Sequence, residues 1–170
     1  MEFRLAKIED LEKINKLFND VIYDMYSKGI KIWHKIYPYC EFENDINNKN
    51  LYVVTHNENI VATFCLFETS ESEMKFEWKE KNSNAVYLSR LAVGVNYRNC
   101  GYGKLALNFA MKLVKSKKAK FIRLYVAKVN TPAINFYLKN GFKKVVGQTC
   151  EYAEILDTYI IEDGYEIKVD

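Results

Sequence analysis

The chain has 170 residues, of which 49% are hydrophobic and 28% charged, and its formal net charge is +3. These values are typical of a globular protein, and the length fits one domain, residues 1–170, with a sizeable core. A nucleic-acid-binding module would need a concentrated basic face, which so balanced a charge does not favour. The N-terminal segment is charged, and no apolar run approaches the ~20 residues that span a bilayer, so we expect a cytoplasmic protein without a membrane partner.

The cysteines do not form a pattern typical of metal binding. None of them forms a C-x-x-C pair, and the chain has two histidines, His34 and His56. We therefore expect no metal and four reduced thiols. The four are Cys40, Cys65, Cys100 and Cys150.

The N-terminal half alternates between strand-like and helix-like patterns. The segment at 2–8, EFRLAKI, predicts a first strand, and apolar residues at spacings of three and four predict a helix from Asp10 to Met25. The apolar face of that helix comprises Leu11, Ile14, Leu17, Phe18, Val21, Ile22 and Met25. A second short element is expected from Ile30 to Tyr37, ending at Pro38. Runs at 51–55 and 60–67 predict a hairpin around a polar His-Asn-Glu-Asn turn, and 68–84 is a charged excursion without a clear period.

The C-terminal half predicts a strand at 85–95, a helix after Gly103, a strand at 121–126 and a helix at 131–140. The last helix has Thr131 as its expected N-cap, Pro132 at the first helical position and Gly141 just past its end. FKKVVG at 142–147 and YEIKV at 165–169 predict two closing strands. The order predicts a mixed α/β domain with antiparallel pairs early and one crossover in the middle.

The stretch YRNCGYGKLAL at 97–107 follows a predicted strand and opens a predicted helix. Gly101 and Gly103 let the backbone turn and let a ligand approach, while Arg98 and Lys104 add positive charge. With the amides of a helix start, they predict a site for phosphate or pyrophosphate. The alternative is a tight turn with incidental basic residues. The glycine spacing matches neither a P-loop nor a dinucleotide-binding loop.

Two motifs in their structural settings resemble the GNAT superfamily of N-acetyltransferases. RNCGYG at 98–103 matches the R/Q-x-x-G-x-G/A loop of that family, and LSRLAV at 88–93 resembles its central strand. NTPAINFYLKNGF at 130–142 is similar to its second signature, and the resemblance covers essentially the whole chain. It implies a mostly antiparallel central sheet flanked by helices, acetyl-CoA as cosubstrate, and no metal.

The resemblance also implies a cofactor site. The loop amides would hold the pyrophosphate, the central strand would pair with the pantetheine arm, and Asn130 would position that arm, its alternative being a plain loop residue. The implied cofactor-binding residues are Leu91, Ala92, Val93, Arg98, Asn99, Cys100, Gly101, Tyr102, Gly103, Lys104, Asn130, Ala133, Phe136 and Tyr137. A catalytic thiol at Cys100 is disfavoured, because direct transfer needs no covalent intermediate.

Acetyl transfer needs a neutral amine, donors for the tetrahedral oxygen and a proton for the departing thiolate. Tyr137 occupies the family's usual position for the general acid, and its alternative is a core or surface tyrosine. The central strand has no carboxylate to act as general base. Glu68, Glu71 and Glu77 are candidates, each also readable as a solvated charge, and a weakly basic amine can lose its proton to water.

The acceptor is expected to be an amine of a small molecule or a protein, contacted by Trp33 and Tyr37 in the aromatic segment IWHKIYP. Tyr23 and Trp78 are weaker candidates for the same contact. A non-catalytic acyl-CoA-binding sensor on the same fold is the alternative function. Relatives are often dimers, so a homodimer is open.

Overall fold

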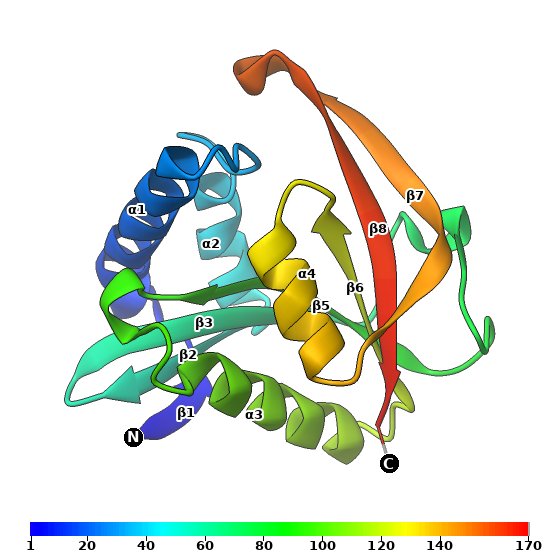
Figure 1. Cartoon of the computed structure of the whole chain (residues 1–170). Coiled ribbons are helices and arrows are strands. Elements are labelled where there is room, and N and C mark those ends of the chain that lie inside the picture. The colour runs from blue at the N-terminus through cyan, green and yellow to red at the C-terminus, as the bar shows by residue number, and fades with distance from the viewer. Residues whose placement is uncertain (170) are drawn as a thin grey trace. The chain divides into compact units, whose positions relative to one another are not determined.

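The computed structural model describes residues 1–169, and contacts between Cα atoms divide the chain into two compact units. The first unit comprises Met1–Leu66 and Ser89–Ala110. The second comprises Phe67–Leu88 and the described residues from Met111 onward. Figure 1 labels the elements of both units. Because each unit has its own core, each is described by itself.

The strands of the described residues are hydrogen-bonded in the order β1-β2-β3-β5-β6-β8-β7-β4. The pairs β1–β2, β2–β3, β4–β7, β6–β8 and β7–β8 are antiparallel, whereas β5 and β6 are parallel and joined through α3. A mostly antiparallel sheet with flanking helices confirms the predicted fold class, including the crossover in the middle.

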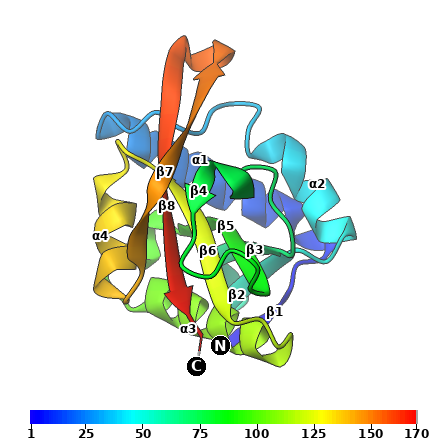
Figure 2. The same ribbon diagram turned by 90° about the vertical axis from the view of Figure 1, so that its right-hand side faces the viewer.

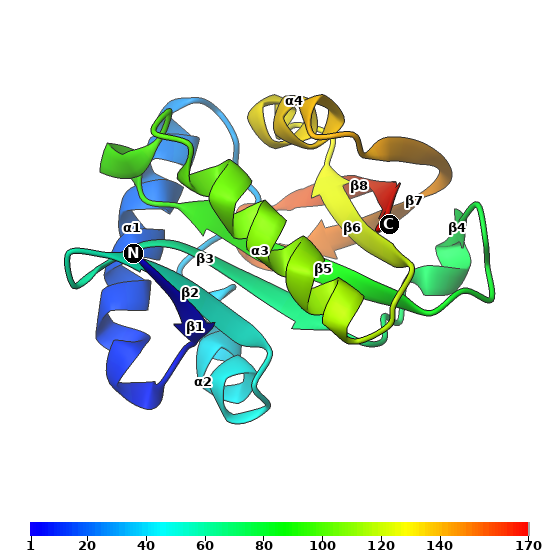
Figure 3. The ribbon, with the colours of Figure 1, turned by 90° about the horizontal axis from the view of Figure 1, so that it is seen from below.

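The first unit contains β1 (Glu2–Leu5), α1 (Leu11–Ser27), α2 (Tyr39–Asn47), β2 (Leu51–His56) and most of β3 (Asn59–Phe67). The second half of β5 (Ala85–Val93) and the first part of α3 (Tyr102–Ser116) complete it. Phe109 of α3 packs on Phe3, Tyr52 and Phe64, with ring centroids 4.9, 6.2 and 6.1 Å away. Figure 3 shows α1 and α2 on the other side of these strands.

The predicted helix over Asp10 to Met25 is confirmed as α1, which buries five of the seven expected apolar residues. Leu11 and Ile22 are only half-buried. The predicted hairpin is also confirmed, with a tighter turn than expected, because His56 and Asn59 already pair with each other.

The expected element over Ile30 to Tyr37 is wrong: this segment is irregular, and the regular element is the helix α2 that starts after Pro38. Only two apolar residues of α2 are buried, Phe42 and Ile46, which is too weak a pattern for sequence periodicity to detect.

The second unit contains the short β4 (Phe76–Glu77), the first half of β5, β6 (Phe121–Ala127), α4 (Thr131–Lys139), β7 (Lys143–Ala153) and β8 (Thr158–Lys168). Figure 2 shows α4 on one side of β6 and β8, and β4 on the other. The two closing strands are far longer than predicted. Their outer halves are mostly exposed, so the apolar alternation that marks a half-buried strand is weak there.

The charged excursion at 68–84 is pinned to the second unit by a fully buried arginine, Arg123. Its Nη1 lies 2.6 Å from Oε1 of Glu73, its Nη2 donates to the carbonyl of Glu80 at 2.7 Å, and its guanidinium carbon lies 4.7 Å from the ring centroid of Trp78. Trp78 is 4% exposed and belongs to a cluster with Phe76 and the strand tyrosines. This tryptophan is therefore core and does not face an acceptor.

Candidate active site

The loop with the predicted phosphate site, residues 97–104, joins β5 to α3 in the first unit. Asn99 and Gly101 adopt left-handed φ values of +60° and +85°. The first intrahelical bond of α3 runs from the N–H of Leu105 to the carbonyl of Gly101, at 3.0 Å. The N–H groups of residues 102–104 precede that bond and therefore project from the helix start. Their amides and the helix dipole form an anion-binding geometry.

Arg98 at the start of this loop forms an ion pair with Asp24 on α1. Lys28 contacts the same carboxylate at 2.7 Å. The hydrogen bonds from Lys28 and Arg98 lower the pKa of Asp24. This contact ties the loop to α1 and was not predicted, since no sequence pattern connects positions 24 and 98. Cys100, in the same loop, is a free and exposed thiol.

The central strand β5 is interrupted by a left-handed residue, Arg90, with φ +50°. A non-glycine residue in that region costs about 1–3 kcal/mol and persists where its surroundings hold it. The carbonyl of Arg90 accepts from the hydroxyl of Thr63 at 3.4 Å. Leu91, Ala92 and Val93, the residues predicted to face the cofactor arm, follow directly. The left-handed conformation of Arg90 therefore changes the direction of the backbone immediately before Leu91, Ala92 and Val93.

Contacts of the Arg90 side chain help to stabilise this left-handed conformation. Its Nη2 lies 2.6 Å from Oδ2 of Asp45 on α2, and the two side chains are 8% and 2% exposed. Its Nη1 also donates to the hydroxyl of Tyr37 at 3.2 Å. Asp45, which sequence reasoning missed, thus connects α2 to the distorted strand. Tyr37, predicted to contact the acceptor, is attached to the same arginine.

In the second unit, α4 carries the second motif. The oxygen of the Asn130 side chain accepts from the N–H of Ala133 at 3.3 Å, so Asn130 is the N-cap. The expected cap at Thr131 is therefore wrong: α4 starts at Thr131, and the asparagine amide one residue earlier reaches the third helical N–H. Pro132 is therefore the second helical residue, one position later in the helix than predicted, whereas Gly141 follows the helix as predicted.

Tyr137, the predicted general acid, lies in α4 and is 8% exposed. Its ring packs edge-on against Phe136 and Phe142, each with centroids 5.3 Å away. Burial raises the pKa of Tyr137. The hydroxyl therefore stays protonated through the neutral range, which is the state that a proton donor needs.

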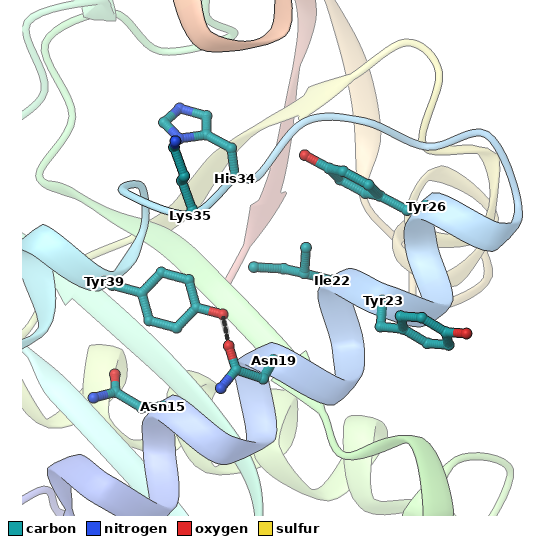
Figure 4. Close-up of a pocket in the computed structure, with 8 residues that line it drawn as sticks. All are labelled: Asn15, Asn19, Ile22, Tyr23, Tyr26, His34, Lys35 and Tyr39. Carbon is teal, nitrogen blue, oxygen red and sulfur yellow. Dashed lines mark hydrogen bonds between the residues drawn. The ribbon is translucent and has the colours of Figure 1, made fainter.

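The predicted acceptor segment lies between α1 and α2. Trp33 packs on Phe18 with centroids 5.2 Å apart, and its carbonyl accepts from the hydroxyl of Tyr26 at 2.8 Å. Beside it is a cavity of about 570 Å³, across which Tyr39 donates to Asn19 at 2.5 Å (Figure 4). Neither Trp33 nor Tyr37 lines this cavity. Its lining, which contains no carboxylate, comprises Asn15, Asn19, Ile22, Tyr23, Tyr26, His34, Lys35 and Tyr39.

The three glutamates considered as general bases, Glu68, Glu71 and Glu77, are exposed. Glu68 forms an ion pair with Lys117 at 2.7 Å, which lowers its pKa. A carboxylate that is solvated and paired is a weak base, so these positions gain no support from the structure. A half-buried carboxylate that sequence reasoning missed, Glu162, lies on β8 in the second unit.

Residues 1–169 show neither a metal site nor a membrane-spanning helix. These residues contain no group of three or more histidine, cysteine, aspartate or glutamate side chains arranged to hold a metal ion. Nor is any helix within the same residues long and apolar enough to cross a membrane.

The sequence matches the model of the acetyltransferase (GNAT) family over residues 15–142, which span both motifs. An N-alpha-acetyltransferase from Sulfurisphaera tokodaii is 39% identical over 171 aligned positions, covering 93% of this chain and 87% of that protein. Both findings concern most of the chain.

Solved structures agree on the fold. A GNAT-family acetyltransferase from Streptococcus agalactiae superposes with a TM-score of 0.80 at 19% identity, covering 99% of this chain and 95% of that one. The PaiA N-acetyltransferase from Thermoplasma acidophilum, solved in complex with coenzyme A, has a TM-score of 0.70 at 22% identity, with 98% of each chain covered.

Proposed function

The chain belongs to the acetyltransferase (GNAT) family and is an acetyl-CoA-dependent N-acetyltransferase, and on that premise we propose that its acceptor is the α-amino group of a protein N-terminus. The relative with 39% identity over most of the chain is an N-alpha-acetyltransferase, which supports this acceptor. The cavity beside Trp33 supports it too. Without a carboxylate in the lining, a polycationic acceptor such as a polyamine gains no charge attraction there.

The observation that carries the proposed binding of acetyl-CoA is the geometry of the phosphate loop. Left-handed Asn99 and Gly101 turn the backbone so that the amides of residues 102–104 face outward at a helix start. A diphosphate fits this arrangement because it offers several acceptor oxygens and a double negative charge. We propose that these amides hold the pyrophosphate, that Leu91, Ala92 and Val93 pair with the pantetheine arm, and that Asn130 contacts it through its NH₂ group.

The reaction we propose is a direct attack. The neutral amine attacks the thioester carbonyl carbon, a backbone N–H of the strand that follows Arg90 stabilises the tetrahedral oxygen, and the carbon–sulfur bond then breaks. Tyr137 donates its hydroxyl proton to the departing thiolate. A thiolate in apolar surroundings has its own pKa raised by the same desolvation that raises the pKa of Tyr137, so the transfer is not strongly uphill.

Binding of the cosubstrate is tested by thermal shift, with acetyl-CoA against ATP and NAD as controls. Ligand at 100 times its Kd adds about 2.7 kcal/mol, which corresponds to a shift of roughly 5–10 °C for a chain of this length. No shift at millimolar acetyl-CoA would refute the proposal that the loop at 97–104 binds the pyrophosphate of acetyl-CoA.

The acceptor is tested by release of free thiol from acetyl-CoA in the presence of peptides. Peptides with a free α-amine should be acetylated, whereas matched peptides with a blocked N-terminus and an internal lysine, and spermidine, should not. Preference for lysine or spermidine would overturn the acceptor. A clear thermal shift with no turnover of any amine would instead indicate the acyl-CoA-binding sensor.

A further inference from the structure

The general base is the part of the chemistry that the two motifs leave open. An α-amine is largely protonated at neutral pH, since its pKa is about 7.7–8.0, so a proton must leave before attack. The central strand β5 has no carboxylate, and the three glutamates considered as bases, Glu68, Glu71 and Glu77, are exposed. Within the second unit, Glu162 is partly buried and lies in β8 opposite the last residue of β6.

Glu162 lies on β8 between β6 and β7. It pairs with Ala127, the last residue of β6, and with Thr149 of β7. The hydroxyl of Thr149 donates to its Oε2 at 3.4 Å. The residue after β6 also holds β8 here, because the N–H of Lys128 donates to the carbonyl of Ile161 at 2.9 Å. The carboxylate therefore lies at the carboxyl end of β6, where the chain turns toward Asn130.

Register places Glu162 on the face of the sheet opposite α4. Residues paired across antiparallel strands share a face, so Glu162 lies on the same side as Glu166, four residues along β8, which contacts Arg123. The side chain of Ile167 projects from the other side. There a Cβ at Gly141, just after α4, would lie 3.3 Å from Cδ1 of Ile167. Tyr137 in α4 and Glu162 are thus on opposite faces near the same end of β6.

This division suits acetyl transfer, because the attacking amine and the departing thiolate occupy different sides of the carbonyl carbon. We propose that Glu162 is the general base, a role that rests on the proposed function. Its carboxylate takes a proton from the acceptor ammonium, and the neutral amine forms the new carbon–nitrogen bond. As the carbon–sulfur bond breaks, Tyr137 protonates the thiolate and is itself reprotonated by the second nitrogen proton. Glu162 then releases its proton to water.

The surroundings of Glu162 favour this role. Burial raises its pKa and so does the charge of Glu151 on β7, while the hydrogen bond from Thr149 opposes them. From β6 the facing titratable group is Tyr125, and beyond it Glu73 of the excursion acts on that tyrosine. A base with a raised pKa takes a proton more readily at neutral pH, and two neighbouring carboxylates attract an ammonium.

The test compares Glu162→Gln with wild type and with Glu77→Gln, a matched loss of an exposed carboxylate from the excursion. We expect kcat of Glu162→Gln on an α-amine peptide to fall about 100-fold at pH 7, with the thermal shift given by acetyl-CoA unchanged. The deficit should shrink toward pH 9, since the amine then loses its proton unaided. Glu77→Gln should match wild type.

Glu162→Asp keeps the carboxylate and serves where the glutamine variant is unstable. It should be slower than wild type yet keep the pH profile of wild type. Equal activity of Glu162→Gln and wild type across pH 6–9, a deficit that does not change with pH, or loss of activity in Glu77→Gln would each overturn the assignment. Failure of the proposed function is distinct, because wild type itself would then release no thiol.

Discussion

A substitution at Gly101 is the sharpest test of phosphate binding by the loop, because an added Cβ there would contact no other atom. Its φ is +85°, and no heavy atom lies within 4 Å of the position a Cβ would take. Gly101→Ala therefore acts through backbone conformation alone, at a cost of about 1–2 kcal/mol for a side chain in the left-handed region. The loop can escape that cost by leaving the left-handed conformation, which re-aims the amides of residues 102–104.

If those amides hold the pyrophosphate, the cost appears as lost affinity. A loss of about 1–2 kcal/mol weakens binding of acetyl-CoA roughly 5- to 30-fold, measured as Kd by titration calorimetry. Gly101→Asn should lose less, because asparagine visits the left-handed region more readily. At saturating acetyl-CoA, kcat should be close to that of wild type.

Gly29 supplies the matched control. Its φ is +75°, and a Cβ there also has nothing within 4 Å, but it lies just after α1 rather than in the loop. Gly29→Ala should lower the melting temperature by a few degrees, as any strained substitution does, and leave the Kd for acetyl-CoA unchanged. Equal Kd values for Gly101→Ala and wild type would refute backbone capture of the phosphates.

Three further substitutions separate the remaining roles. Tyr137→Phe should lower kcat about 100-fold while leaving the Kd for acetyl-CoA unchanged; a drop in affinity alone would make Tyr137 a packing residue. Asp45→Asn leaves the buried Arg90 charge without its counter-ion, so it should cost about 3 kcal/mol of stability, or roughly 10 °C in thermal unfolding; an unchanged melting temperature would contradict this. Glu151→Gln removes a charge that raises the pKa of Glu162, so the acid limb of the rate profile should move to lower pH; a move to higher pH would contradict the base assignment.

Local sequence signals predicted the elements whose pattern lies within one short segment. Seven apolar residues on one helical face predicted α1, and runs of β-branched residues around a polar turn predicted the β2–β3 hairpin. The predicted N-cap of α4 was wrong by one residue, because Asn130 and Thr131 are both residue types that favour the N-cap position. Only the hydrogen bond from the N–H of Ala133 to the Asn130 side chain decides between them.

Long-range side-chain contacts were out of reach of sequence patterns. Asp24 and Arg98 are 74 positions apart, and Arg90 and Asp45 are 45 apart. Nothing in the composition of α1 or α2 distinguishes those aspartates from solvated ones. Sequence patterns could not single out Glu162 for a related reason: its proposed role depends on which strands β8 pairs with and in which register, and tertiary structure decides that.

The visible and hidden residues differ in how they act. Groups that act through the backbone leave a mark in sequence, because a left-handed turn at a helix start selects glycine or asparagine at fixed spacing. Groups that act through a side chain can be supplied by any element that reaches the same place, so their positions carry no local spacing. A strand without a carboxylate therefore does not imply a missing base. On this chain the acid that we propose lies in the second motif, on α4, whereas the base that we propose is positioned by the register of β8 against β6.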